Sequence, residues 1–142
     1  MKKVVVISLL FIGFLLPTTL AHAEENTSTS EITVNMQTLN NITNTTNTVS
    51  VYGSTLYSSS SLDSSTTVDT VGLRIYLQRK QSSWVNTTQS KEYTDSNTSS
   101  ISRTTSFQLQ RGYYYRVKIV HFIKDNGSYE SDITYSSIID FR

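Results

Sequence analysis

The chain has 142 residues, of which 37% are hydrophobic and 16% charged, with 12 Lys and Arg against 11 Asp and Glu. This length fits one domain, with or without a tail. The lack of Cys excludes a disulfide framework, a Cys-ligated metal site and a cysteine nucleophile. The near balance of charge argues against nucleic-acid binding, which usually needs a clear positive excess.

The first 23 residues have the three parts of a secretory signal peptide. Lys2 and Lys3 precede an apolar run over residues 4–16, and Pro17 ends it before the small residues of Ala21-His22-Ala23. The alternative is a retained membrane anchor, but the apolar run is shorter than the roughly 17 residues that span a bilayer. We therefore predict a secreted, extracellular protein that is cleaved after Ala23 and has no integral membrane segment.

Residues 24–48 are rich in Ser, Thr and Asn and are predicted to form a leader. Apolar residues alternate at positions 32, 34 and 36, which favours one strand near 32–46, although a disordered leader fits the composition equally well. Cleavage leaves ten basic residues, all at or beyond Arg74, and a single histidine, His121. The folded domain is predicted to span residues 49–142.

The domain is predicted to be all-β, because Thr, Ser, Tyr, Val and Ile dominate it and alternate with period two. Residues 71–77 place large aliphatic side chains on one face, and Arg74, Tyr76 and Gln78 on the other. Short strands separated by Ser, Asn and Gly predict an antiparallel β-sandwich of six to seven strands, immunoglobulin- or fibronectin III-like, or else a barrel. The predicted strands are 49–57, 67–79, 84–93, 100–109, 113–123 and 129–141.

The segment Leu109–Ile119 resembles the tyrosine corner of fibronectin type III domains. Gly112 permits the turn, and Leu109 and Val117 point inward. The resemblance implies that Tyr115 is the corner tyrosine, with a buried ring and a hydroxyl bonded to the backbone upstream. Arg111 stands where such domains usually have Pro, and their early tryptophan has no clear counterpart here.

A broader resemblance is to a family of small secreted β-proteins of Gram-positive bacteria. It is carried by Leu73–Lys80, then Trp84, then Gly112–Arg116 with the letters GYYYR, then Glu130-Ser131, in this order. The family resembles this chain in size and in its signal peptide. The resemblance implies location and fold and assigns no chemistry.

The last two strands are predicted to form a hairpin with an odd-numbered loop. Both place apolar residues at odd positions, so burying both odd faces requires paired residue numbers with an even sum. Asp125-Asn126-Gly127 would then be the loop, and Ile119 would pair with Ile133.

No residue pattern predicts catalysis, a metal or a cofactor. His121 shares the core-facing parity of Tyr115 and Val117, so a Ser-His-acid triad has no accessible base. The acidic residues lie in no glycosidase pattern. The segment Asp125–Glu130 lacks the ligand spacing of a calcium loop and is predicted to be a turn. We expect no enzyme.

The sequence predicts a non-catalytic interaction module that binds an extracellular protein, a cell-wall polymer or a carbohydrate. On the outward face of strand 113–123, Tyr114, Arg116, Lys118 and Phe122 put aromatic rings beside cations, and Trp84 is a possible second contact. The alternative is a toxin or antimicrobial effector in which residues 58–70 line a membrane hairpin. That stretch lacks an apolar face for lipid.

Signal cleavage is directly testable. N-terminal sequencing of the secreted product should begin at Glu24, because the small residues at 21 and 23 suit signal peptidase. A cell-bound product that begins at Met1 would contradict the assignment.

Overall fold

The computed structural model describes residues 41–142, which form one curled antiparallel sheet. Its strands are β1 (Ile42–Tyr52), β2 (Thr55–Lys80), β3 (Trp84–Gln108), β4 (Tyr113–Asp125), β5 (Ser128–Tyr135) and β6 (Ile139–Phe141), and residues 41–142 contain no helix. The all-β, antiparallel prediction is confirmed. The sheet begins at Ile42, within the predicted leader, and residues 24–40 lie outside the described part.

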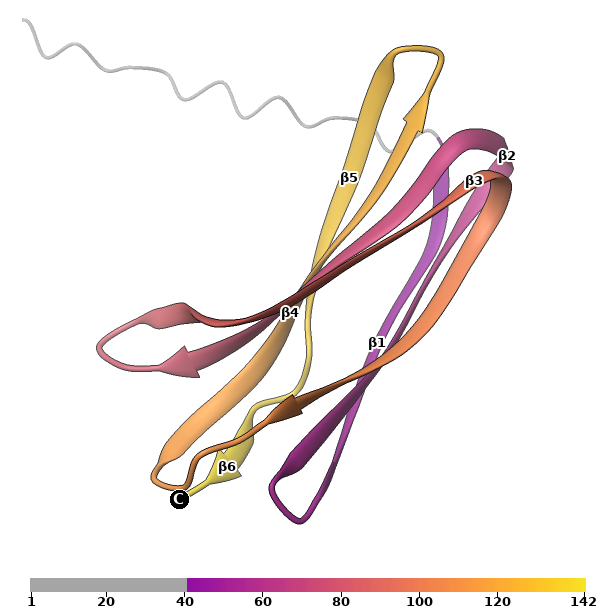
Figure 1. The fold of residues 1–142 in the computed structure, drawn as a ribbon. Helices are drawn as coiled ribbons and strands as arrows, with labels where there is room; N and C mark the ends of the chain where they lie inside the picture. The colour runs from indigo at the N-terminus through magenta and orange to yellow at the C-terminus, as the bar shows by residue number, and fades with distance from the viewer. Residues whose placement is uncertain (1–40) are drawn as a thin grey trace, which may run out of the picture. The chain divides into compact units, whose positions relative to one another are not determined.

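Two long strands carry the architecture. The first half of β2 pairs with β1, its second half pairs with β4, and β3 follows it on the other side almost throughout. Then β4 pairs with β5 and, near its start, with β6. Figure 1 shows β2 and β3 turning together at the upper right, so that the two halves of the hairpin lie in different parts of the curl.

The bend is made by unequal strand lengths. Four residues of β2 lie between Asp63 and Val68, whereas one residue of β3 lies between their partners Ser100 and Thr98. Extra residues in one strand bend it and increase its twist. On β3, Asn97 adopts φ 53°, a left-handed conformation that Asn tolerates better than most residues. Breaks predicted at residues 58–66 and 94–99 were wrong, because both strands bend there and do not end.

The three extra residues in β2 also change which of its side chains are buried, from even-numbered to odd-numbered positions. Before the bend its even-numbered side chains are buried, as at Leu56 and Leu62, and after it the odd-numbered ones are, as at Leu73 and Leu77. An odd surplus must do this, because side chains alternate with period two. The core therefore forms between the two halves of the same strand. Its other buried members include Val71, Ile75, Ile101, Phe107, Val117, Ile119 and Ile123.

Two predicted strand boundaries were wrong because of a tight turn. Tyr52 pairs with Thr55 across Gly53 and Ser54, and Gly53 has φ 60°. A glycine at the first central position suits a two-residue hairpin turn. The predicted strand 49–57 is therefore the end of β1 and the start of β2.

The predicted odd loop in the last hairpin is wrong. Asp125 pairs with Ser128 across Asn126 and Gly127, and Ile119 lies opposite Thr134. Asn126 and Gly127 both have positive φ, as a type I′ turn requires, and Asn-Gly is the dipeptide that most favours it. The turn chemistry therefore outweighs the hydrophobic pattern of β5.

The inward face of β5 is polar as a result. Ile133 and Tyr135 are 47% and 48% exposed, whereas Glu130 is buried. The Glu130 carboxylate accepts hydrogen bonds from the backbone N–H groups of Asn41 and Ile42, at 2.8 Å for Ile42. This contact fastens the start of β1 to β5. The strand predicted at 129–141 is divided into β5 and β6.

The tyrosine corner is confirmed. Tyr115 is 2% exposed, and its hydroxyl donates to the Gln110 carbonyl at 3.1 Å and accepts from the Gln110 N–H at 3.2 Å. Gly112 has φ 96° at the turn between β3 and β4. The ring packs in the core cluster with Leu109 and Val117, so one side chain fixes the entry of the chain into β4.

Substitution at the corner should destabilise the protein in two steps. Tyr115→Phe removes the two hydrogen bonds and should lower the free energy of unfolding by about 1 kcal/mol. Tyr115→Ala also leaves a cavity and should lower it by about 3 kcal/mol or more. Chemical denaturation measures both. Tyr113→Phe is the matched control, because Tyr113 is 37% exposed and its hydroxyl bonds to none of residues 41–142. An unchanged midpoint for Tyr115→Ala would contradict the assignment.

Candidate functional site

One face of the sheet gathers 6 of the 13 aromatic and 5 of the 10 cationic side chains of residues 41–142. We name it the outer face, and it is formed by the side of β2, β3, β4 and β5 that points away from the core. Its rows follow the pairing: Tyr76 lies opposite Lys118, Arg74 opposite Val120, and Lys118 opposite Tyr135. The face comprises Gly72, Arg74, Tyr76, Gln78, Lys80, Trp84, Glu92, Tyr114, Arg116, Lys118, Val120, Phe122, Lys124, Tyr129, Ile133 and Tyr135.

Near one end of this face, the guanidinium of Arg116 lies beside two aromatic rings. Its guanidinium carbon lies 4.6 Å from the centroid of the Trp84 ring and 4.0 Å from that of Tyr135. Its Nε donates to Gln78 Oε1 at 2.8 Å. The Arg116 Nη atoms make no hydrogen bond within residues 41–142. Two ring contacts and one hydrogen bond therefore hold the guanidinium and leave its Nη atoms available to an acceptor.

Phe122 is not an exposed contact, which corrects the prediction for this residue. It is 1% exposed, and its ring lies on the backbone of Gly72, so closely that a Cβ added there would come within 2.1 Å of it. The Arg74 guanidinium lies 4.5 Å above the ring, and Tyr129 stacks at 5.9 Å. Phe122 therefore supports the outer face from beneath.

The outer face is positively charged. Its Glu92 is in an ion pair with Arg74 at 2.8 Å, and this hydrogen bond raises the pKa of Arg74. At its edge, Asp140 pairs with Arg142, whose hydrogen bond lowers the pKa of that carboxyl. The remaining cations, Lys80, Arg116, Lys118 and Lys124, are in no ion pair with any of residues 41–142.

The structure brings four of the five predicted site residues onto one surface without burying them. Tyr114, Arg116 and Lys118 lie on the same side of β4, and Trp84 reaches Arg116 from the start of β3. Sequence reasoning missed Tyr135, because its parity was assigned to the core. The Asn126-Gly127 dipeptide is the signal that would have placed it outward.

His121 lies on the opposite, core side of β4. It is fully buried, and its Nε2 lies 2.9 Å from Thr134 Oγ1. Burial lowers the pKa of His121 to about 4, against the opposing effects of the Asp132 charge and the Ser61 backbone. The ring is neutral at physiological pH and has no path to a substrate on the outer face.

Residues 41–142 lack two further features. No group of three or more His, Cys, Asp or Glu side chains there is arranged to hold a metal ion. The described residues also include no helix long and apolar enough to cross a membrane.

Comparisons of the chain with protein-family models, with curated proteins and with solved structures find no match. The geometry of the outer face is therefore the guide to function.

The buried histidine should make stability depend on pH. Its pKa of about 4 in the folded state lies below the value of 6.5 expected on unfolding, so the unfolded chain binds the proton more readily. The contribution of neutral His121 to the free energy of unfolding is complete above pH 6.5 and declines by about 3 kcal/mol as pH falls toward 4. Urea denaturation of wild type and His121→Gln over this range should show a shallower decline in the variant. NMR titration of His121 with a midpoint near 6.5 would contradict the shift.

Proposed function

We propose that the protein is a secreted, non-catalytic binding module whose outer face recognises an anionic glycan, such as a cell-wall polymer. The single observation that carries the proposal is Arg116, whose guanidinium lies over the rings of Trp84 and Tyr135 and whose Nη atoms bond to none of residues 41–142. Indole and phenol rings stack on the flat faces of sugars, and a guanidinium donates two parallel hydrogen bonds to a carboxylate or a phosphate.

The distribution of charge supports the same ligand class. Lys118 lies two residues from Arg116 on the same side of β4, Lys80 lies near the Trp84 ring, and Lys124 lies at the far end of β4. None of the three has a carboxylate partner among residues 41–142. Several uncompensated cations on one face attract a polyanion and give its binding a strong dependence on salt. The resemblance to secreted proteins of Gram-positive bacteria agrees with a wall polymer as the source of the charge.

We also propose that the curled sheet is a variant of the immunoglobulin-like sandwich. If β2 and β3 are each divided at the bend, residues 41–142 have seven segments besides the short β6, and such sandwiches have seven strands. The first half of β2 then lies between β1 and the second half of β3, and the remaining segments form the other layer. The tyrosine corner begins the sixth segment, its place in those domains.

Retention on purified Gram-positive cell walls tests the proposed function. Arg116→Gln should reduce retention at least about tenfold, because a charge-assisted hydrogen bond contributes roughly 1.5–3 kcal/mol. Trp84→Ala and Tyr135→Ala should each reduce it less, by the loss of one stacked ring. Walls stripped of anionic polymer should retain the wild type weakly.

The matched control is Lys91→Gln. Lys91 is an exposed cation of β3, but its partner Ile75 belongs to the core face. Its substitution removes the same charge from the same sheet and should leave retention unchanged. Equal retention of Arg116→Gln and wild type, with both folded by near-ultraviolet circular dichroism, would refute the proposal. Leakage of anionic vesicles without wall retention would favour the membrane-acting alternative.

A further inference from the structure

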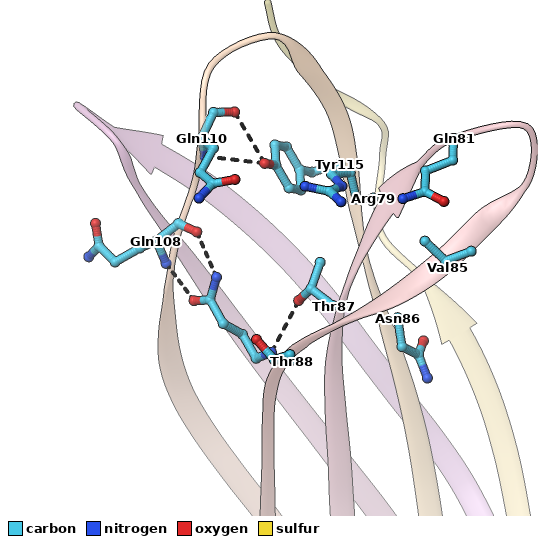
Figure 2. Close-up of a pocket in the computed structure, with 10 residues that line it drawn as sticks. Arg79, Gln81, Val85, Asn86, Thr87, Thr88, Gln108, Gln110 and Tyr115 are labelled. Atoms are coloured by element: carbon cyan, nitrogen blue, oxygen red, sulfur yellow. Dashed lines mark hydrogen bonds between the residues drawn. The ribbon is translucent and has the colours of Figure 1, made fainter.

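A hollow of about 370 Å³ lies at the end of the sheet where β3 begins and ends. Figure 2 shows Arg79 within it, with Gln108 and Gln110 on one side and Gln81, Val85 and Asn86 on the other. This volume is at the lower end of the range of about 300–1,000 Å³ typical of small-molecule sites. It suits a ligand of the size of a mono- or disaccharide.

Arg79 is the charged residue that lines the hollow, and its charge is uncompensated by the residues around it. It takes part in none of the ion pairs of residues 41–142. Its Nε is enclosed and has no hydrogen-bond acceptor among them. No Asp or Glu lines the hollow. A guanidinium that is partly removed from water without a carboxylate partner is unfavourable unless another anion compensates it.

The neighbouring rings hold the guanidinium in place. Its carbon lies 4.3 Å from the centroid of Tyr113, and Arg79 pairs with Tyr115 across β2 and β4. Tyr115 is fixed in turn by its bonds to Gln110. The cation is therefore positioned before any ligand arrives, which limits the entropy lost on binding.

The rest of the lining offers neutral hydrogen-bonding groups. Three of these groups bond to no other described residue: the side-chain amides of Gln81 and Gln110 and the hydroxyl of Thr88. The side-chain amide of Gln89, by contrast, donates to the Gln108 carbonyl and accepts from the Gln108 N–H. Asn86 Oδ1 accepts from Gln78, which leaves its NH₂ group to donate. One fixed cation surrounded by amides and a hydroxyl matches one negative charge on a ligand that is otherwise rich in hydroxyl groups.

We propose that this hollow is a second binding site, distinct from the outer face, which takes a sugar acid with its carboxylate on Arg79. A carboxylate is planar and carries a single charge, which one guanidinium matches, whereas a phosphate dianion is usually bound by more than one cation. The amides of Gln81, Asn86 and Gln110 bind the sugar hydroxyls. The site stands independently of the proposed function of the outer face.

Titration of the full secreted chain with glucuronate, followed by NMR, tests this site. The side-chain amide signals of Gln81, Asn86 and Gln110 should shift and saturate. Glucose lacks the charge and acetate lacks the hydroxyls, so each should bind at least about tenfold more weakly, a difference of 1.4 kcal/mol. Arg79→Gln should weaken glucuronate binding by a similar factor, and Arg79→Lys should restore it only in part.

Two variants separate this site from its surroundings. Arg111→Gln removes a nearby cation that does not line the hollow, and Lys91→Gln removes an exposed cation of β3 that does not line it, so neither should change glucuronate binding. If Arg79→Gln fails to fold, Gln81→Ala, at an exposed position, should still weaken binding measurably. The proposal is overturned if the three amide signals do not move, if acetate or glucose binds as well as glucuronate, or if Arg111→Gln abolishes the shifts.

Discussion

The bend shared by β2 and β3 is the constraint on which the rest of the fold depends. Because β2 carries three more residues than β3 between Asp63 and Val68, it changes the parity of its buried side chains and joins both parts of the curl. This brings Leu56 and Leu62 into one core cluster with the inward side chains of β4 and gives each half of β2 its own neighbour, β1 or β4. A core closed by one continuous strand needs no disulfide to tie its halves together, which suits a chain without Cys.

The two proposed sites follow from the same strand. After the bend, the even positions of β2 point outward, so Arg74, Tyr76 and Gln78 contribute to the outer face. The odd positions point inward. Arg79 is one of them, and it lies near the β2–β3 turn, where it lines the hollow. A hydrogen-bonded chain from Arg116 through Gln78 to Asn86 joins the outer face to the lining of the hollow. Adjacent residues of one strand thus supply two sites of different chemistry.

Stability and recognition depend on different aromatic residues of the sheet. Phe122 covers Gly72, whose missing Cβ makes room for the ring, and it supports Arg74 and Tyr129 above. Tyr115 closes the turn into β4 through its hydroxyl. Packed rings of this kind hold the strands in register, so that the exposed rings beside Arg116 keep a fixed spacing.

The all-β class, the corner at Tyr115 and the two faces of β4 could be predicted from the sequence, because period-two alternation and a glycine turn are local signals. It also brought Tyr114, Arg116 and Lys118 together, since they share one face of one strand. Only the tertiary structure placed Trp84 and Tyr135 on either side of Arg116, buried Phe122 over Gly72, and enclosed Arg79. These contacts depend on strand pairing, and pairing was decided by the surplus in β2 and by the Asn126-Gly127 turn, whose backbone geometry outweighed the apolar pattern of β5.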